Sequence, residues 1–85
     1  MQTIDNAHYK VLQIIYSIVK DDPYPLKYYV HPRELILRSM QDWTEIQLSL
    51  TALENEEFII TRRLDTLQIS ITEQGFNLCR SSIHT

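Results

Sequence analysis

The stretch DWTEIQLSLTALENEEFIITRRLDTLQISIT, residues 42–72, decides the fold of this protein. Its first half carries large apolar residues at spacings of 3, 4 and 3, which places them on one face of a helix that runs to about Glu56. These residues are Trp43, Ile46, Leu50 and Leu53. We expect this face to be buried in the core. Asp42 is expected to cap the helix, with Glu45 completing a capping box.

The second half of the stretch changes from a helical period to a strand period. Residues 58–63 begin with aromatic and β-branched side chains, and residues 67–72 alternate between apolar and polar. Between them, Asp65 tolerates the backbone conformations that a tight turn needs. The two strands are therefore predicted to form a hairpin with a short tip.

The N-terminal part is predicted to form a helix, a turn and a short strand. Asp5 is placed to cap the helix, which ends near Lys20, ahead of two prolines that disfavour helical conformation in the residues before them. Residues 26–30 then suit a short extended strand. We expect the nearby tyrosines to close the edge of the core rather than to form a recognition platform. They are Tyr24, Tyr28 and Tyr29.

Two further helices complete the prediction. One begins at Pro32, because proline is well suited to a first helical position, and turns three apolar side chains toward the helix of residues 42–56. They are Leu35, Ile36 and Met40. The last helix begins after its cap, Thr72, and runs to about Ser81. It is expected to turn Phe76 and Cys79, or Leu78, toward the core.

Length and composition favour one domain that spans residues 1–85, because 85 residues supply a single modest core. An apolar content of 44% and a charged content of 22% are typical of globular chains. A net charge of −3 gives no overall basic field. No apolar run is long enough to span a bilayer and the N-terminus lacks the regions of a secretion signal. We therefore expect a cytoplasmic protein without membrane contact.

The sequence lacks the residue patterns that catalysis and metal binding need. His8, His31 and His84 fall on separate predicted segments, and Cys79 is the one cysteine, so no zinc-type ligand spacing exists. Gly75 is the one glycine, which leaves no glycine-rich loop to hold a phosphate. We expect no enzyme activity, no metal and no cofactor.

The predicted hairpin and its flanks resemble bacterial winged helix-turn-helix transcription regulators. Residues 53–59 read LENEEFI and residues 71–75 read ITEQG, which is similar to the L-E-x-x-G-x-I … L-T-x-x-G signature of the multiple-antibiotic-resistance regulators. The resemblance covers about residues 32–80 and implies an α+β fold with a three-helix core, a hairpin wing and a C-terminal helix. Glu57 stands where the signature has glycine. Either Glu57 is strained, or the helix ends earlier, at Asn55.

The resemblance also implies where DNA would bind. The exposed face of the helix of residues 42–56 would enter the major groove, while cations at the start of the preceding helix and in the wing hold the phosphate backbone. Carried over by position, the base-contacting residues are Thr44, Glu45, Gln47, Leu48 and Thr51. The backbone-contacting residues are Arg33, Arg62 and Arg63. Double-stranded DNA is one expected partner.

The charge of the same helix favours a different partner. Residues 41–57 contain five acidic residues and no lysine or arginine, so their surface repels phosphate. An acidic face with an exposed Leu48 suits a protein partner, and the broad apolar surface of the first helix leaves a homodimer open. The frequency of DNA binding among winged helices favours a DNA-binding regulator, whereas composition favours a protein-interaction module.

Overall fold

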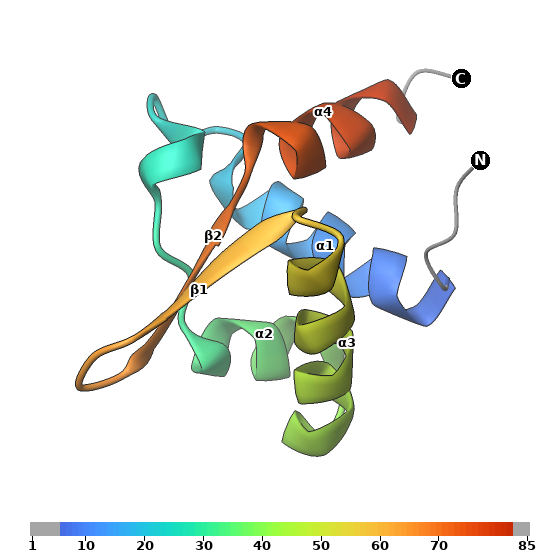
Figure 1. The fold of residues 1–85 in the computed structure, drawn as a ribbon, viewed down its shortest axis with the longest axis vertical. Helices are drawn as coiled ribbons and strands as arrows, with labels where there is room; N and C mark the ends of the chain where they lie inside the picture. Colours follow the sequence, from blue (N-terminus) through green and yellow to red (C-terminus); the bar gives the residue numbers. More distant parts are fainter. Residues whose placement is uncertain (1–5, 83–85) are drawn as a thin grey trace.

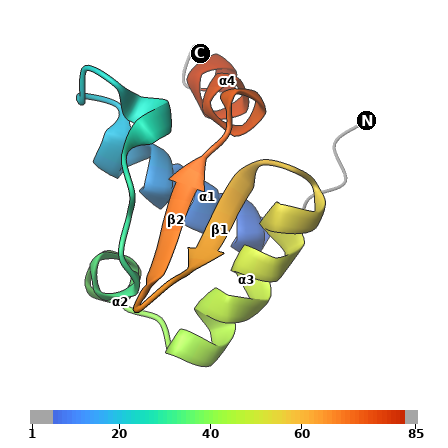
Figure 2. The same cartoon turned by 60° about the vertical axis from the view of Figure 1, so that its left-hand side comes forward.

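A computed structural model of the protein describes residues 6–82 (Figure 1). Its elements follow the predicted α+β order except near residue 26. They are α1 (Asn6–Val19), the 3-10 turn η1 (Pro25–Lys27), α2 (Pro32–Ser39), α3 (Trp43–Asn55), β1 (Ile59–Arg63), β2 (Leu67–Ile71) and α4 (Glu73–Ser82). The predicted cap at Asp5 lies outside the described residues. The hairpin of β1 and β2 projects from the body of the molecule (Figures 1 and 2).

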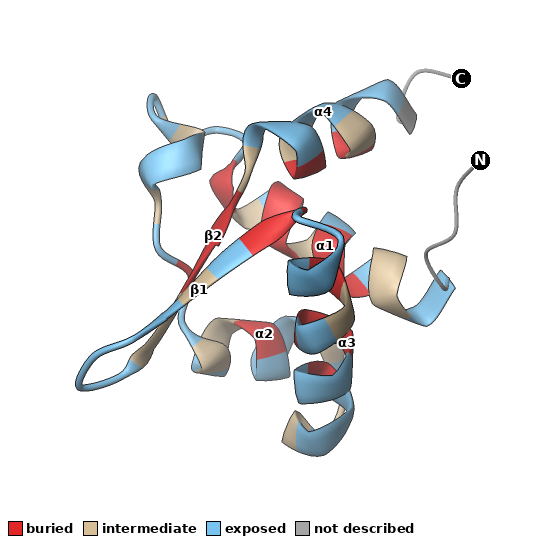
Figure 3. Cartoon of the chain, viewed as in Figure 1, coloured by how far each residue is buried: buried red, intermediate tan, exposed pale blue. Residues whose placement is uncertain are grey.

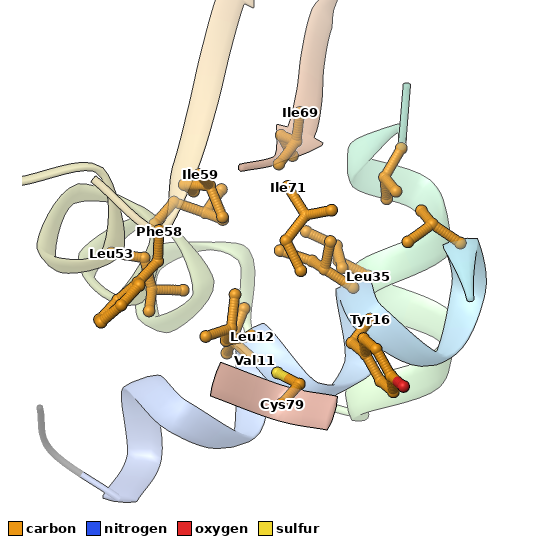
Figure 4. Close-up of a cluster of buried hydrophobic side chains, with 14 of the residues drawn as sticks. Val11, Leu12, Tyr16, Leu35, Leu53, Phe58, Ile59, Ile69, Ile71 and Cys79 are labelled. Atoms are coloured by element: carbon orange, nitrogen blue, oxygen red, sulfur yellow. The ribbon is translucent and has the colours of Figure 1, made fainter. Parts of the chain in front are cut away.

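Helix α1 lies at the centre of the core. It contacts α2, α3, α4 and β2, and the buried residues gather on the surfaces where these elements meet (Figure 3). Leu12, Ile15 and Val19 are completely buried, and each such side chain stabilises the fold by about 1.5 to 3 kcal/mol. Figure 4 shows Leu12 of α1 within this buried cluster. Ile14 and Ile18 are partly buried against the same cluster. The broad apolar surface of α1 is therefore largely used inside the chain.

Helix α3 confirms most of the predicted stripe and corrects its start. Ile46, Leu50 and Leu53 are buried, whereas Trp43 is half-buried and packs on the edge of the core. The predicted capping box is wrong, because the side chain of Asp42 makes no cap hydrogen bond. Asp42 is exposed, so water is available to the first-turn amides in place of a side-chain cap.

Helix α2 buries only one of its three predicted core residues. Leu35 is completely buried, whereas Ile36 is 39% and Met40 is 89% exposed. Neighbouring residues in a helix point in different directions, so Ile36 cannot share the inward face of Leu35. The helix ends at Ser39, and Met40 adopts a left-handed φ of 60°. That conformation takes Met40 off the helical face.

The predicted strand of residues 26–30 is wrong. The fixed φ of Pro25 suits the start of a helical turn, and residues 25–27 form η1 instead. Among residues 26–30, Val30 forms a β-bridge with the hairpin: its N–H donates to the carbonyl of Ile69 at 2.7 Å, and its carbonyl accepts from the N–H of Ile69 at 3.0 Å. The tyrosines depart from prediction too. Tyr28 packs against the core, but Tyr24 is 70% and Tyr29 is 40% exposed.

The hairpin and its short tip are confirmed. Ile59 pairs with Ile71 and Arg63 pairs with Leu67 in an antiparallel ladder, and a hydrogen bond from Leu64 N–H to the carbonyl of Thr66 closes the turn at 3.2 Å. Because side chains alternate between the two faces of a strand, Ile59 and Ile71 enter the core.

Both alternatives for the end of α3 occur together. The helix ends at Asn55, and Glu57 takes a left-handed φ of 66°. A residue with a Cβ loses about 1 kcal/mol there relative to glycine. The carbonyl of Glu57 accepts a 2.7 Å hydrogen bond from the Thr72 hydroxyl, which helps to hold the strained backbone in place.

Thr72 and Gly75 join the base of the hairpin to α4. The Thr72 hydroxyl accepts the N–H of Gly75 at 3.0 Å, which confirms the predicted cap. The N–H of Thr72 donates to the carbonyl of Phe58 at 3.0 Å. A Cβ placed on Gly75 would lie 2.3 Å from that carbonyl oxygen. Glycine is therefore needed here for close approach rather than for an unusual φ.

We predict that Gly75→Ala destabilises the fold by about 1 to 3 kcal/mol, because the added methyl must push α4 away from the carbonyl of Phe58. Helix propensity alone acts in the opposite direction by about 1 kcal/mol. Asn77→Ala, at an exposed position of the same helix, is the control. Urea unfolding that found Gly75→Ala more stable than the parent would contradict the packing.

We also predict that Leu50→Ala lowers the free energy of unfolding by about 2 to 5 kcal/mol, since Leu50 is only 4% exposed. Leu48→Ala removes the same atoms from a side chain that is 65% exposed in the same helix. That control is expected to stay within about 0.5 kcal/mol of the parent. If both variants lost the same free energy of unfolding, the assignment of the buried face of α3 would be wrong.

Candidate nucleic-acid interface

The eight predicted DNA-contacting residues are all exposed. They are Arg33, Thr44, Glu45, Gln47, Leu48, Thr51, Arg62 and Arg63. Five of them lie on α3, where its buried stripe faces α1 and leaves the other side of the helix open. Arg33 lies in the first turn of α2, and the two wing arginines end β1.

A small cleft between α3 and the wing brings three of these residues together. Gln47, Thr51 and Arg63 line it, and its volume is about 40 Å³. The hydroxyl of Thr61 donates to the carboxylate of Glu54 at 2.8 Å beside this cleft, so the wing is linked to the helix by a charge-assisted hydrogen bond. Arg33, Thr44 and Leu48 do not line the cleft.

The wing arginines point to opposite sides of β1, because neighbouring residues in a strand alternate. Arg63 lines the cleft with α3. Arg62 donates a 3.2 Å hydrogen bond to the hydroxyl of Tyr29, and its guanidinium carbon lies 6.0 Å from the centre of that ring. Tyr29 therefore positions an exposed cation. The sequence contained no signal for this pair, because 33 residues separate the two partners.

Carboxylates and apolar side chains share this surface with the arginines. Glu54 lies beside Arg63 in the small cleft and partly offsets its charge. A wider hollow of about 680 Å³ at the base of the wing is also acidic, being lined by Glu54, Glu57 and Glu73. Leu37 and Leu48 are 68% and 65% exposed. On this surface, positive charge therefore comes from the wing and from α2.

The surroundings of Cys79 do not favour a catalytic role for its thiol. Its side chain is buried in the core, and burial raises the pKa of the thiol to about 12. The thiol therefore stays protonated near neutral pH and does not act as a nucleophile. Within residues 6–82, no three histidine, cysteine or carboxylate side chains converge in a way that would hold a metal ion.

Among the helices of residues 6–82, none combines the length and the apolar character that crossing a membrane requires. No protein-family model matches the sequence, and no curated protein matches it.

Solved structures do match the fold. ZitR from Lactococcus lactis, in a mutant form, superposes with a TM-score of 0.74 at 10% identity, over 96% of this chain and 52% of that one. MepR from Staphylococcus aureus, a transcription regulator of the multidrug efflux pump MepA, gives 0.72 at 18% identity, over 94% and 57%. AF1382 from Archaeoglobus fulgidus gives 0.68 at 15% identity, over 87% and 80%.

The chain therefore has the winged helix-turn-helix fold, with α2 and α3 as the helix-turn-helix and the β1–β2 hairpin as the wing. It spans about half the length of ZitR and MepR.

Proposed function

We propose that the protein is a small winged-helix transcription regulator that contacts double-stranded DNA through α3 and the wing. The observation that carries this proposal is the cleft in which Arg63 lies beside Gln47 and Thr51. An amide and a hydroxyl suit the edges of bases in the major groove, and an adjacent guanidinium suits a phosphate. The winged-helix fold presents both from one side of the molecule.

Four of the five α3 candidates divide the contact by chemistry. Thr44, Gln47 and Thr51 offer hydrogen bonds to base edges, and Leu48 offers apolar contact to a thymine methyl group. No arginine or lysine on α3 is available for guanine. We therefore expect the preferred sites to be rich in A·T pairs at the positions that α3 contacts.

Phosphate contacts come from a small number of cations. Arg33, Arg62 and Arg63 would release about three counterions, which gives a slope of log affinity against log salt near −3. Tyr29 already holds Arg62 in one place, so less side-chain freedom is lost when a phosphate binds. The acidic residues of α3 repel the phosphates and so oppose the attraction from these arginines. Affinity for any single duplex is therefore expected to be modest.

We predict that replacing Arg62 and Arg63 together with alanine weakens binding to all duplexes alike and flattens the salt slope by about one to two units. Base preference is expected to remain, because phosphate contacts carry no sequence information directly. The control is Lys10→Ala with Arg80→Ala, which removes the same charge from exposed positions on α1 and α4. Fluorescence anisotropy of a labelled duplex across a salt series measures the affinity and the salt slope of each variant.

The DNA proposal fails if the double wing variant binds as the parent does. It also fails if the parent shows no binding above the non-specific range of about 10⁻⁴ to 10⁻⁶ M on any duplex.

A second candidate, a protein-interaction module, is favoured by the apolar surface of the helix-turn-helix. Leu37, Met40 and Leu48 are 68%, 89% and 65% exposed, and large exposed side chains on an acidic face suit a protein rather than a phosphate backbone. Under this function the wing arginines contribute little to association.

We predict that, for a protein partner, Leu48→Asp abolishes association because it places a charge in the apolar contact. Leu64→Asp, at the equally exposed tip of the wing, is the matched control and is expected to leave association unchanged. Co-purification of the partner with each variant measures this. If the Leu48→Asp variant still bound the partner, the partner would not contact α3 at Leu48.

A further inference from the structure

Tyr29 lies on the same face of the hairpin as Arg62. The segment between η1 and α2 runs beside β2 (Figure 2), and its Val30 and the bridged Ile69 are completely buried in the core. Thr61 pairs with Ile69 from the other side of β2. Because neighbouring residues of an extended chain point to opposite faces, Tyr29 and Arg62 both point away from the core. We call this side of the hairpin its outer face.

The β2 strand leaves room for these two side chains to meet. On the outer face it contributes Gln68, which pairs with Arg62, and the small side chain of Ser70, so the Tyr29 ring reaches across β2. Arg62 Nη1 donates to the Tyr29 hydroxyl at 3.2 Å, and the guanidinium carbon lies 6.0 Å from the centre of the ring. The backbone hydrogen bonds of the next residue, Val30, fix the position of Tyr29.

The Tyr29 hydroxyl keeps a hydrogen that it can donate to a ligand. A phenol hydroxyl both donates and accepts hydrogen bonds. In its contact with Arg62 the hydroxyl is the acceptor, so its own hydrogen is not used there. A guanidinium carries several N–H donors, and this contact uses one of them. The two side chains therefore offer hydrogen-bond donors from one place on the outer face.

The pair also keeps the positive charge of Arg62, because its partner is an uncharged phenol rather than a carboxylate. Arg63 differs in this respect, since it lies beside Glu54 in the small cleft. Both members of the pair are exposed, so an anion can reach them together. The oxygens of a phosphate diester only accept hydrogen bonds, and they bind most strongly to donors that carry or adjoin a charge.

We propose that Tyr29 and Arg62 form one binding site for a backbone phosphate of duplex DNA, in which the hydroxyl and the guanidinium donate to the same phosphate group. This inference rests on the proposed function and adds a contact residue outside α3 and the wing. The segment that carries Tyr29 leads directly into α2, where Arg33 lies. The site thus extends the phosphate contacts of the wing toward α2.

Fluorescence anisotropy of a labelled duplex across a salt series tests the site. Tyr29→Phe removes the hydroxyl and keeps the ring, and it is expected to weaken binding by about five- to tenfold. Its salt slope is expected to equal that of the parent because no charge is lost, whereas Arg62→Ala flattens the slope by about one unit. Tyr24→Phe removes the hydroxyl of another exposed tyrosine, beside α4, and is expected to bind as the parent does.

The same change in two backgrounds tests whether the two side chains share one phosphate. In an Arg62→Ala background, Tyr29→Phe is expected to weaken binding by about twofold or less, because the shared site is already lost. In an Arg63→Ala background the full loss of about five- to tenfold is expected, since Arg63 lies on the other side of β1, in the cleft with α3. A folding defect would lower affinity equally in both backgrounds.

Three outcomes overturn the proposal. If Tyr29→Phe binds as the parent does, the hydroxyl does not contact DNA. If it causes equal losses in the Arg62→Ala and Arg63→Ala backgrounds, the two side chains do not share a phosphate. Either result leaves DNA binding by α3 and the wing in place. A parent that binds no duplex overturns both this site and the proposed function.

Discussion

The close approach of α4 to the carbonyl of Phe58 is the constraint on which the arrangement of the wing depends. Gly75 allows that approach, and Thr72 holds three segments at one point through bonds to Glu57, Phe58 and Gly75. These bonds join the end of α3, the start of β1 and the start of α4. The wing leaves the body at a defined angle because its base has so little freedom.

The same junction explains why a strained residue is retained. Glu57 occupies a left-handed conformation in which glycine would be unstrained. The chain tolerates that cost because the hydrogen bond from Thr72 and the buried side chain of Phe58 fix the residues around it. A stable junction in turn holds Arg63 beside the exposed face of α3.

Local patterns in the sequence were enough to predict the parts of the fold with regular spacing. The stripe of α3 and the alternation of β2 are periodic, so Leu50, Leu53 and Ile71 were placed correctly. Met40, Tyr24 and residues 26–30 were not, because their positions depend on a left-handed residue and a proline turn rather than on periodicity. Exposure of the candidate site residues was predictable, since it follows from the buried stripe.

The grouping of the site residues was not predictable, because it depends on contacts between distant segments. Arg62 contacts Tyr29, and Arg63 comes to line a cleft with Gln47, only once the hairpin has been placed against the helices. The same placement brings unlike groups onto one surface. Arg33 lies on α2, Arg62 and Arg63 lie on the wing, and Glu54 lies beside Arg63 in the small cleft. Leu48 is exposed on α3, so it is a candidate contact for either a DNA partner or a protein partner.

The most direct test of a DNA-contacting winged helix is a map of amide chemical shifts as a random-sequence duplex is added at low salt. The account predicts that the largest changes fall on the exposed face of α3, at Thr44, Gln47 and Thr51, and on Arg62 and Arg63 in the wing. An unchanged spectrum would contradict it, and so would changes confined to α4 and residues 23–27.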